Sequence, residues 1–413
     1  MARFHFKCIE CSEEYPEDPH RLVCSRCAAE QMPGGAIRGV LEVVYKSLPD
    51  AWPHFRLSDP EFLHAFLPIS DESVLPPLPI GDTPLLEDTR LRDEFDMPHL
   101  VVKDDTRNPS GSTKDRASLL VVTKALEYGC DTVATASTGN AASALAAVAA
   151  AAGIRAVVFA PATAPPAKLT QMMSYGATVI PVEGSYDQAF ELCRAACDHF
   201  GWYNRNTALN PFTIEGKKTA AIEIAAVLSP DPPDVVLIPT GDGVILGGIA
   251  KGFRDLAATG LIPKLPRLIA VQAEASAAIA KAIRSGADEV APLQEATSVA
   301  DSLNVEMPRN AIGCLAEVRR SEGAGVIVTD DAILAAIPKL ASTTGVFAEP
   351  AGAAALAGLE SALEEGLVDR DERAILMVTG TGLKDVAAAA RVLPTPDPVE
   401  PTLEAVEARI LNS

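Results

Sequence analysis

The sequence predicts an α/β protein with two doubly wound parallel-sheet domains and a small N-terminal zinc ribbon. From about residue 100, short apolar runs of strand length alternate with amphipathic runs of helix length, and glycine-rich loops join them. The predicted strands are apolar throughout, which is typical of parallel sheets covered by helices on both faces. The zinc ribbon rests on four closely spaced cysteines near the N-terminus.

The composition is that of a globular protein long enough for two domains of ordinary size. The 413 residues are 48% hydrophobic and 22% charged. The net charge of −20 opposes general attraction to nucleic acid or anionic lipid. No run approaches the roughly 20 apolar residues that span a bilayer, and the start, MARFHFKCIEC, has no apolar core of the secretory type. We therefore expect a cytoplasmic protein that binds neither nucleic acid nor membrane.

The cysteines of residues 1–30 have the spacing C-x2-C, twelve residues, C-x2-C. Two such pairs bring four thiolates onto one tetrahedral zinc ion, which can organise a segment too short to bury a core. The alternative is two unrelated cysteine pairs. Acidic residues surround the motif and oppose nucleic-acid binding, so we interpret the zinc as structural. Its expected ligands are Cys8, Cys11, Cys24 and Cys27.

The first α/β unit is expected at residues 86–212, after a connector at 31–85 that is rich in proline and aromatic residues. The helix expected at 114–128 has apolar residues at helical spacing, Leu119, Val122 and Leu126, and Gly129 fits the position just past its C-terminus. The other expected helices are 141–152, a segment through Met173, and 186–200. The expected strands are 100–104, 131–136, 155–161 and 177–184.

The second α/β unit is expected at residues 213–390, followed by a C-terminal tail at 391–413. Its strands are short and apolar, and each leads into a segment of helical pattern. The expected strands are 234–240, 267–273, 325–329 and 373–379.

Four loops at the ends of these strands are candidates for a binding site, because ligands of open parallel sheets bind at the carboxyl ends of the strands. All four are rich in glycine and hydroxyl groups, which suits close approach of backbone N–H groups to an anion. They are DTRNPSGSTKDR (105–116), STGN (137–140), GDGVILGG (241–248) and GTGLKD (380–385). The loop GDGVILGG lacks the ending of a P-loop and the spacing of GxGxxG, and its alternative interpretation is an ordinary tight turn.

Lys114 stands where the first of these loops becomes a helix. A helix N-terminus destabilises the ammonium form and lowers the pKa of the amine, which favours attack on a carbonyl. An aldehyde cofactor that carries a phosphate would use both Lys114 and the loop GDGVILGG. The alternative is a lysine that extends to solvent.

Together these loops resemble those of the fold type II pyridoxal-phosphate enzymes, the tryptophan-synthase-β-like family, over roughly residues 80 to 390. The resemblance implies that Lys114 forms the Schiff base with pyridoxal 5′-phosphate and that Asn140 bonds the 3′-oxygen of the cofactor. It also implies that Thr379 meets the pyridine nitrogen. The substrate carboxylate would be held by Ser137, Thr138 and Gly139. The cofactor phosphate would be held by Gly241, Asp242, Gly243, Val244 and Ile245.

Within that family, GDTPLL (81–86), NPFTIEGKKTAAIEI (210–224) and GTGLKD (380–385) look like segments of the threonine synthases. This resemblance implies a homodimeric carbon–oxygen lyase that converts O-phospho-L-homoserine and water to L-threonine and phosphate. Thr213 stands where that group usually has an arginine for the substrate phosphate, and Arg205 and Lys217 are the candidates for the replacement charge. The stretch ADSLNVEMPRN (300–310) resembles the serine/threonine dehydratases instead, so dehydration or β-replacement on a hydroxy- or phospho-amino acid is the alternative.

Overall fold

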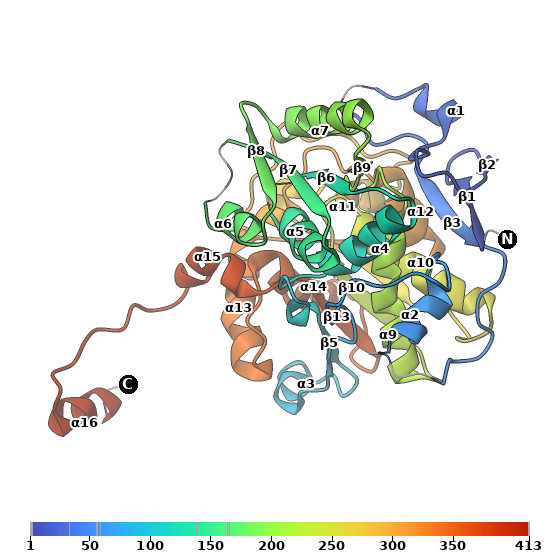
Figure 1. Ribbon diagram of the computed structural model, residues 1–413. Coiled ribbons are helices and arrows are strands. Elements are labelled where there is room, and N and C mark those ends of the chain that lie inside the picture. Colours follow the sequence, from blue (N-terminus) through green and yellow to red (C-terminus); the bar gives the residue numbers. More distant parts are fainter. Residues whose placement is uncertain are drawn as a thin grey trace.

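The computed structural model describes residues 3–32, 34–54, 57, 59–137, 139–162, 164 and 166–411. Two largely parallel sheets with flanking helices form the body of the molecule, and a small antiparallel sheet lies at the N-terminus (Figure 1). The expected α/β architecture with parallel sheets is therefore confirmed. No helix among the described residues is long and apolar enough to cross a membrane.

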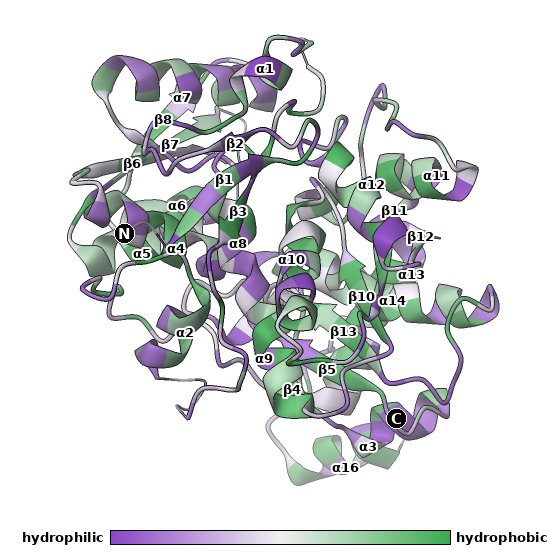
Figure 2. Ribbon diagram, turned by 90° about the vertical axis from the view of Figure 1, so that its right-hand side faces the viewer, coloured by the Kyte–Doolittle hydropathy of each residue, from purple (hydrophilic) through white to green (hydrophobic). Residues whose placement is uncertain are grey.

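The larger sheet has six strands in the order β12-β11-β10-β13-β5-β4. All neighbours pair in parallel except the short edge strand β4, which pairs antiparallel with β5. Figure 2 shows hydrophobic colour over the central strands β10 and β13, which are buried along their whole length. The strands are β4 (Leu85–Leu86), β5 (Val101–Asp104), β10 (Val235–Pro239), β11 (Arg267–Ala273), β12 (Ala324–Val328) and β13 (Ala374–Val378).

Helices cover both faces of the larger sheet because its strands are apolar on both sides. Val235 and Leu237 of β10 pack into a core with α13 and α14, whereas Val236 and Ile238 pack into a second core with α9 and α10. The helices of this half are α9 (Thr219–Leu228), α10 (Val244–Ala258), α11 (Ala278–Ser285), α12 (Ala311–Arg320), α13 (Asp330–Thr344) and α14 (Pro350–Glu364).

The smaller sheet has four parallel strands in the order β8-β7-β6-β9. Its core residues alternate between a cluster shared with α4 and α5 on one face and a cluster shared with α7 on the other. The strands are β6 (Thr132–Ala136), β7 (Arg155–Pro161), β8 (Thr178–Val182) and β9 (Tyr203–Asn204). The helices are α4 (Lys114–Glu127), α5 (Asn140–Ala152), α6 (Pro166–Ser174), α7 (Tyr186–Phe200) and the short α8 (Phe212–Glu215).

Strand β5 belongs to the larger sheet, although its residues fall within the range expected for the first α/β unit. It pairs in parallel with β13, which lies more than 250 residues later in the chain, from Val101 opposite Ile375 to Asp104 opposite Val378. This pairing places the loop that carries Lys114 beside the loop that follows β13. The apolar pattern predicted the strand but held no information about its partner.

The N-terminal sheet has the order β2-β1-β3, and all its pairs are antiparallel. Strand β3 lies in the segment expected to be a connector. Phe4 and Phe6 of β1 are buried, and their rings lie 5.9 and 5.7 Å from the ring of Phe212 in α8. The sheet therefore packs directly on the body. The elements before β4 are β1 (Phe4–Cys8), β2 (Glu14–Tyr15), α1 (Ser25–Ala28), β3 (Leu41–Tyr45) and α2 (Pro60–Phe66).

Three further helices lie at the periphery of the molecule. Helix α3 (Thr89–Phe95) precedes β5, and α15 (Val386–Ala390) follows the last strand. Helix α16 (Leu403–Leu411) buries none of its residues and lies at the end of an extended segment (Figure 1). Among the described residues after β13, only those of α15 contribute to the hydrophobic core.

Candidate functional site

A cavity of about 420 Å³ lies where the loops after β5, β6, β10 and β13 meet. It brings together residues from three of the four candidate loops and Thr379, which directly precedes the fourth, although these segments are far apart in the sequence. The predicted site residues that line it are Lys114, Ser137, Gly139, Asn140, Gly241, Asp242, Gly243, Val244, Ile245 and Thr379. Thr138 lies outside the described residues.

Lys114 is the first residue of α4, and its side chain lines the cavity. Burial lowers the pKa of its amine to about 8, and the charge of Arg205 adds to this effect, while Glu349 and Asp242 oppose it. The lowered pKa was expected, but its first cause is burial rather than the helix terminus alone. Since no hydrogen bond or ion pair joins the Lys114 amine to another described side chain, it is available as a nucleophile near neutral pH.

The loop before Lys114 is hydrogen-bonded to the loop after β13. The N–H of Thr113 donates to the carbonyl of Thr379 over 2.9 Å, and the N–H of Thr381 donates to the carbonyl of Gly111 over 2.9 Å. Gly111 has a φ of +82°, and a Cβ there would lie 2.7 Å from the Thr381 side chain. A glycine is therefore required where the two loops meet, and their contact holds Lys114 close to Thr379.

Arg116, two residues after Lys114, anchors the start of α4 in a fully buried ionic network. Its guanidinium donates two hydrogen bonds of 2.9 and 2.8 Å to Asp105 and two of 2.5 and 2.8 Å to Glu223. Lys103 donates to Glu223 over 2.6 Å. Burial opposes ionisation of Asp105, but the Arg116 guanidinium lowers the pKa of that carboxyl to about 2. Asp105, Glu223 and Arg116 are therefore charged at neutral pH, and this network fixes the position of Lys114.

The loop between β10 and α10 forms a cradle of backbone N–H groups at a helix N-terminus. Gly243 has a φ of +80°, and a Cβ there would lie 2.7 Å from the Cβ of Cys314. A Cβ on Gly241 would lie 3.2 Å from the carbonyl oxygen of Ser302. No side chain caps the first turn of α10. The free N–H groups of this turn therefore face the cavity as a site for an anion.

Asp242 carries a carboxylate within this loop, but that group is directed to the backbone of the segment 300–310. Its Oδ1 accepts a hydrogen bond of 3.0 Å from the N–H of Arg309, and its carbonyl accepts one of 3.0 Å from the N–H of Asn310. Burial raises the pKa of Asp242. Asp242 therefore joins the loop to a second wall of the cavity.

Asn140 contacts a residue that the sequence analysis did not identify. Its Nδ2 donates to Oε1 of Glu349 over 2.7 Å, while its Oδ1 is buried without a hydrogen-bond partner. Burial raises the pKa of Glu349 to about 7, and the nearby charge of Asp301 adds to the effect. Glu349 precedes the proline that starts α14, and this helix-start pattern was the only local signal of its position.

The segment 300–310 forms part of the cavity wall, which the sequence analysis did not predict. Residues 301–307 and Arg309 line the cavity. Asp301 is ion-paired with Lys168 of α6, and Arg309 is ion-paired with Asp187 of α7. These two ion pairs join the wall to the smaller sheet. The stretch that departs from the threonine synthase pattern is thus positioned to contact a ligand.

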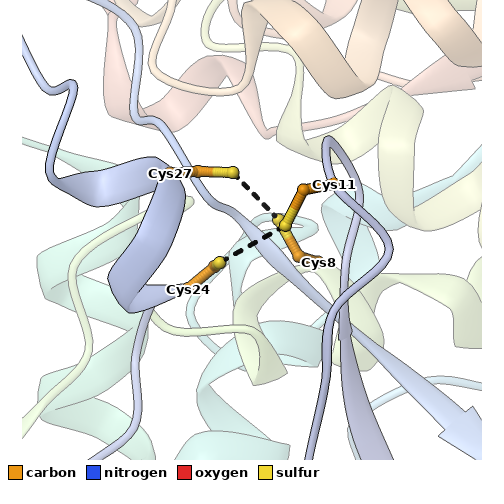
Figure 3. Close-up of side chains that lie close together, drawn as sticks. All are labelled: Cys8, Cys11, Cys24 and Cys27. Atoms are coloured by element: carbon orange, nitrogen blue, oxygen red, sulfur yellow. Dashed lines mark hydrogen bonds between the residues drawn. The ribbon is translucent and has the colours of Figure 1, made fainter.

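The four N-terminal cysteines lie together, as their spacing predicted (Figure 3). Their sulfur atoms all lie within 4.8 Å of one another. The Cys8–Cys27 and Cys11–Cys24 sulfur pairs are 3.7 and 3.6 Å apart, close to the roughly 3.8 Å that a tetrahedral ion with zinc–sulfur bonds of about 2.3 Å requires. The cluster is compatible with the expected zinc site.

The residues of the cavity fit pyridoxal phosphate. A buried amine of lowered pKa can react with an aldehyde, and the uncapped N–H groups at the start of α10, where Gly243 adopts a positive φ, can bind a phosphate. The Oδ1 of Asn140 is buried and lacks a partner. Each of these three features matches one part of that cofactor.

Comparisons with known proteins agree with this fit. Residues 77–380 match the family of pyridoxal-phosphate dependent enzymes. The chain is 36% identical over 423 residues to a threonine synthase of Methanosarcina acetivorans, covering 99% of both chains. It is 36% identical over 401 residues to a threonine synthase of Methanocaldococcus jannaschii, covering 95% of this chain and 96% of the relative.

Solved structures of similar fold include maize serine racemase, with a TM-score of 0.65 and 22% identity over 75% of this chain and 91% of that one. They also include threonine deaminase isoform 2 of Solanum lycopersicum, with a TM-score of 0.64 and 21% identity over 85% of this chain and 94% of that one. At this identity they establish the fold alone. The family match and the nearly full-length relatives show that the chain belongs to the pyridoxal-phosphate dependent enzymes, among the relatives of the threonine synthases.

Proposed function

We propose that this protein is a threonine synthase, which converts O-phospho-L-homoserine and water to L-threonine and phosphate. The observation that carries the proposal is the meeting of Lys114, the glycine cradle and Thr379 in one cavity, in a chain that aligns over 99% of its length with a threonine synthase. The match to the pyridoxal-phosphate dependent enzymes supports the cofactor.

When bound, pyridoxal phosphate withdraws electrons from the substrate and so acidifies the protons at its α and β carbons. Lys114 would hold the cofactor and then, once released by the substrate amine, move protons at these two carbons. A pKa of about 8 suits this role, because the amine then exists in both protonation states near neutral pH. Phosphate leaves from the γ carbon, and water adds at the β carbon.

The other cavity residues would bind and orient the reactants. The backbone N–H groups of residues 241–245 would hold the cofactor phosphate, and Asn140 would bond the 3′-oxygen. The neutral hydroxyl of Thr379 would meet the ring nitrogen without the permanent charge that an aspartate would bring. Ser137 and Gly139, with Thr138 between them, would hold the substrate carboxylate.

A second candidate is dehydration or β-replacement on a hydroxy- or phospho-amino acid. The cavity wall at residues 301–307 favours it, since this is the stretch that resembles the dehydratases. Thr213, in place of the usual arginine, is buried and accepts a hydrogen bond from the N–H of Ala208 over 3.3 Å. This residue therefore supplies no charge for a substrate phosphate.

The two activities are separated by their products. We expect purified protein reconstituted with pyridoxal phosphate to release phosphate and form threonine from O-phosphohomoserine. Ammonia and a keto acid formed from serine or threonine, without turnover of O-phosphohomoserine, would favour the second candidate. Lys114→Ala should abolish the absorbance of the lysine-bound cofactor, and a variant that keeps this absorbance contradicts the assignment of Lys114.

We also propose that Cys8, Cys11, Cys24 and Cys27 bind one structural zinc ion. The support is the distance between their sulfur atoms, which matches a tetrahedral site. Elemental analysis of the purified protein should give one zinc per chain, and Cys11→Ser with Cys24→Ser should remove it. We further propose that the protein is a cytoplasmic homodimer. Sedimentation equilibrium of the purified protein tests the dimeric state.

A further inference from the structure

Besides Lys114, two buried cations among the described residues lack the carboxylate partners that the other buried cations have. Within the described part of the chain, neither Arg205 nor Lys217 takes part in an ion pair. A buried cation is normally paired, because an unpaired charge in the interior costs several kcal/mol. The buried cations that are paired with carboxylates include Lys103, Arg116, Lys124, Lys218 and Lys251.

Lys217 lies in the short helical turn after α8 and lines the cavity, with only 1% of its surface exposed. Its Nζ donates one hydrogen bond of 2.8 Å, to the carbonyl of Thr213. Lys218, the next residue, is equally buried but forms ion pairs with Glu215 and Asp255. The two neighbouring lysines thus differ in their partners, since carboxylates within the protein contact Lys218 but not Lys217.

Arg205 is fully buried beside the same region. Its Nε and Nη1 donate to the hydroxyls of Ser118 and Thr207 over 3.4 and 3.2 Å, and its Nη2 is buried without a partner. Burial, followed by the charges of Arg205 and Lys114, lowers the pKa of Lys217 well below its usual value. Three basic groups, two of which line the cavity, therefore lie close enough for their charges to act on one another.

We propose that Lys217, with the charge of Arg205 behind it, binds the phosphate group of a phosphate monoester in the cavity. A dianion matches the two unpaired cations in charge, and Nζ of Lys217 retains N–H groups to donate to it. Lys217 also packs against α10, since a Cβ built on Gly248 of this helix would lie 2.6 Å from the Cβ of Lys217. The inference rests on the proposed function, because both the cofactor and the substrate of that reaction carry such a phosphate.

Lys217→Met tests the site with inorganic phosphate as the probe. In protein freed of pyridoxal phosphate, phosphate should raise the melting temperature of the wild type, and this rise should be lost in Lys217→Met. Lys217→Arg should restore most of it. Lys339→Met is the matched control, because it removes the same charge from α13, where Lys339 is ion-paired with Glu360, and it should keep the full rise.

The stability of the variant without phosphate separates binding from folding. Since methionine fills a similar volume without an unpaired charge, Lys217→Met should melt no lower than the wild type when phosphate is absent. A variant that melts lower, and still shows the full rise with phosphate, would overturn the proposal and make Lys217 a structural residue.

Two affinities then identify which phosphate is bound. A loss of about tenfold or more in affinity for pyridoxal phosphate, with unchanged affinity for pyridoxal, assigns Lys217 to the cofactor. A rise of the same size in KM for O-phosphohomoserine, with unchanged cofactor affinity and kcat, assigns it to the substrate. If neither changes, the proposal is wrong. Failure of the wild type to turn over O-phosphohomoserine bears on the proposed function alone, because the phosphate-induced rise does not depend on turnover.

Discussion

At the scale of single residues, the chemistry depends on how burial sets the charge of Lys114. Its amine has a pKa of about 8 instead of the usual 10.5, chiefly because it is desolvated. A lowered pKa of an amine means that the neutral form dominates above pH 8 rather than above pH 10.5. The residue that the sequence marked by its position at a helix start is thus activated mainly by the enclosing cavity.

This pKa predicts how the protein takes up its cofactor. The rate of recombination of cofactor-free protein with pyridoxal phosphate should rise with pH and level off above about pH 8, because only the neutral amine attacks the aldehyde. Stopped-flow absorbance measures this rate. The reaction of the cofactor with an N-acetylated lysine is the control, and its rate should keep rising toward pH 10.5. Identical pH profiles for the two amines would contradict the lowered pKa.

The Arg116 network makes a prediction about stability. Arg116→Met leaves Asp105 and Glu223 buried without their partner, so the free energy of unfolding should fall by about 3–5 kcal/mol at neutral pH. Urea denaturation measures the loss. Arg391→Met removes an exposed arginine and should change stability by less than about 0.5 kcal/mol. A similar effect of both substitutions would contradict the role of the network.

The same network predicts a loss of stability in acid. The folded-state pKa of Asp105 is lowered to about 2 from 3.8, so its contribution is present above about pH 4 and is lost as the pH falls to about 2. This difference corresponds to about 2 kcal/mol for a fully buried group. Asp105→Asn should lack this part of the acid dependence in urea titrations between pH 4 and pH 2, whereas a wild-type slope in the variant would place the titration elsewhere.

At the scale of elements, local patterns predicted the helices and strands well where their ends carry a chemical signal. Helix α7 was expected at 186–200 and has these bounds, because Ser185 and Gln188 form a capping box and Gly201 ends the helix with a φ of +70°. The eight longer strands of the two largely parallel sheets were likewise predicted, whereas the two-residue strands β4 and β9 were not. Strand β3 was not predicted because the segment around it does not alternate between helix and strand patterns. Its partner β1 is also more than 30 residues away in the sequence.

The start of α10 gives a prediction for an element rather than a side chain. In Gly243→Ala, the alanine must adopt a φ of +80°, and its Cβ would lie 2.7 Å from the Cβ of Cys314, so the first turn of α10 must shift. We expect affinity for pyridoxal phosphate to fall tenfold or more, as measured by absorbance titration. Gly260→Ala is the matched control after the other end of α10. It has a φ of +78° with no atom within 4 Å, so it should cost about 1–2 kcal/mol of stability and leave cofactor affinity unchanged.

At the scale of the whole molecule, the sequence could predict the chemistry of the four loops but not the walls that enclose them. Rules of parallel sheets place loops at one edge, which is why Lys114, Asn140 and Thr379 were found together. The hydrogen bond between Asn140 and Glu349 joins residues 209 positions apart. No local pattern encodes such a contact. The cavity face of the segment 300–310 is likewise a property of the packed molecule.

The N-terminal cysteine module is connected to the cavity by the same kind of long-range packing. The N–H of Cys24 donates to the carbonyl of Gly39 over 2.8 Å, in the segment that leads into β3. Two residues earlier, the N–H of Ile37 donates to the carbonyl of Arg309 over 2.9 Å. Nη1 of Arg309 donates to the carbonyl of Gly35 over 3.2 Å. The segment 34–40 therefore holds Arg309, which in turn donates to Asp242 of the glycine cradle.

This connection predicts that loss of the proposed metal at the cysteines changes the cavity. Removal of the metal with a chelator should increase hydrogen exchange first in residues 3–45 and then in residues 241–245, because Arg309 loses the segment that holds it. Affinity for pyridoxal phosphate should fall several-fold, and added zinc should restore both properties. Peptides from α13 serve as the internal control, because none of the hydrogen bonds described for the segment 34–40 involves this helix. If exchange increases only in residues 3–45 and cofactor affinity is unchanged, the module stabilises itself alone, and its contacts with Arg309 have no effect on the cradle.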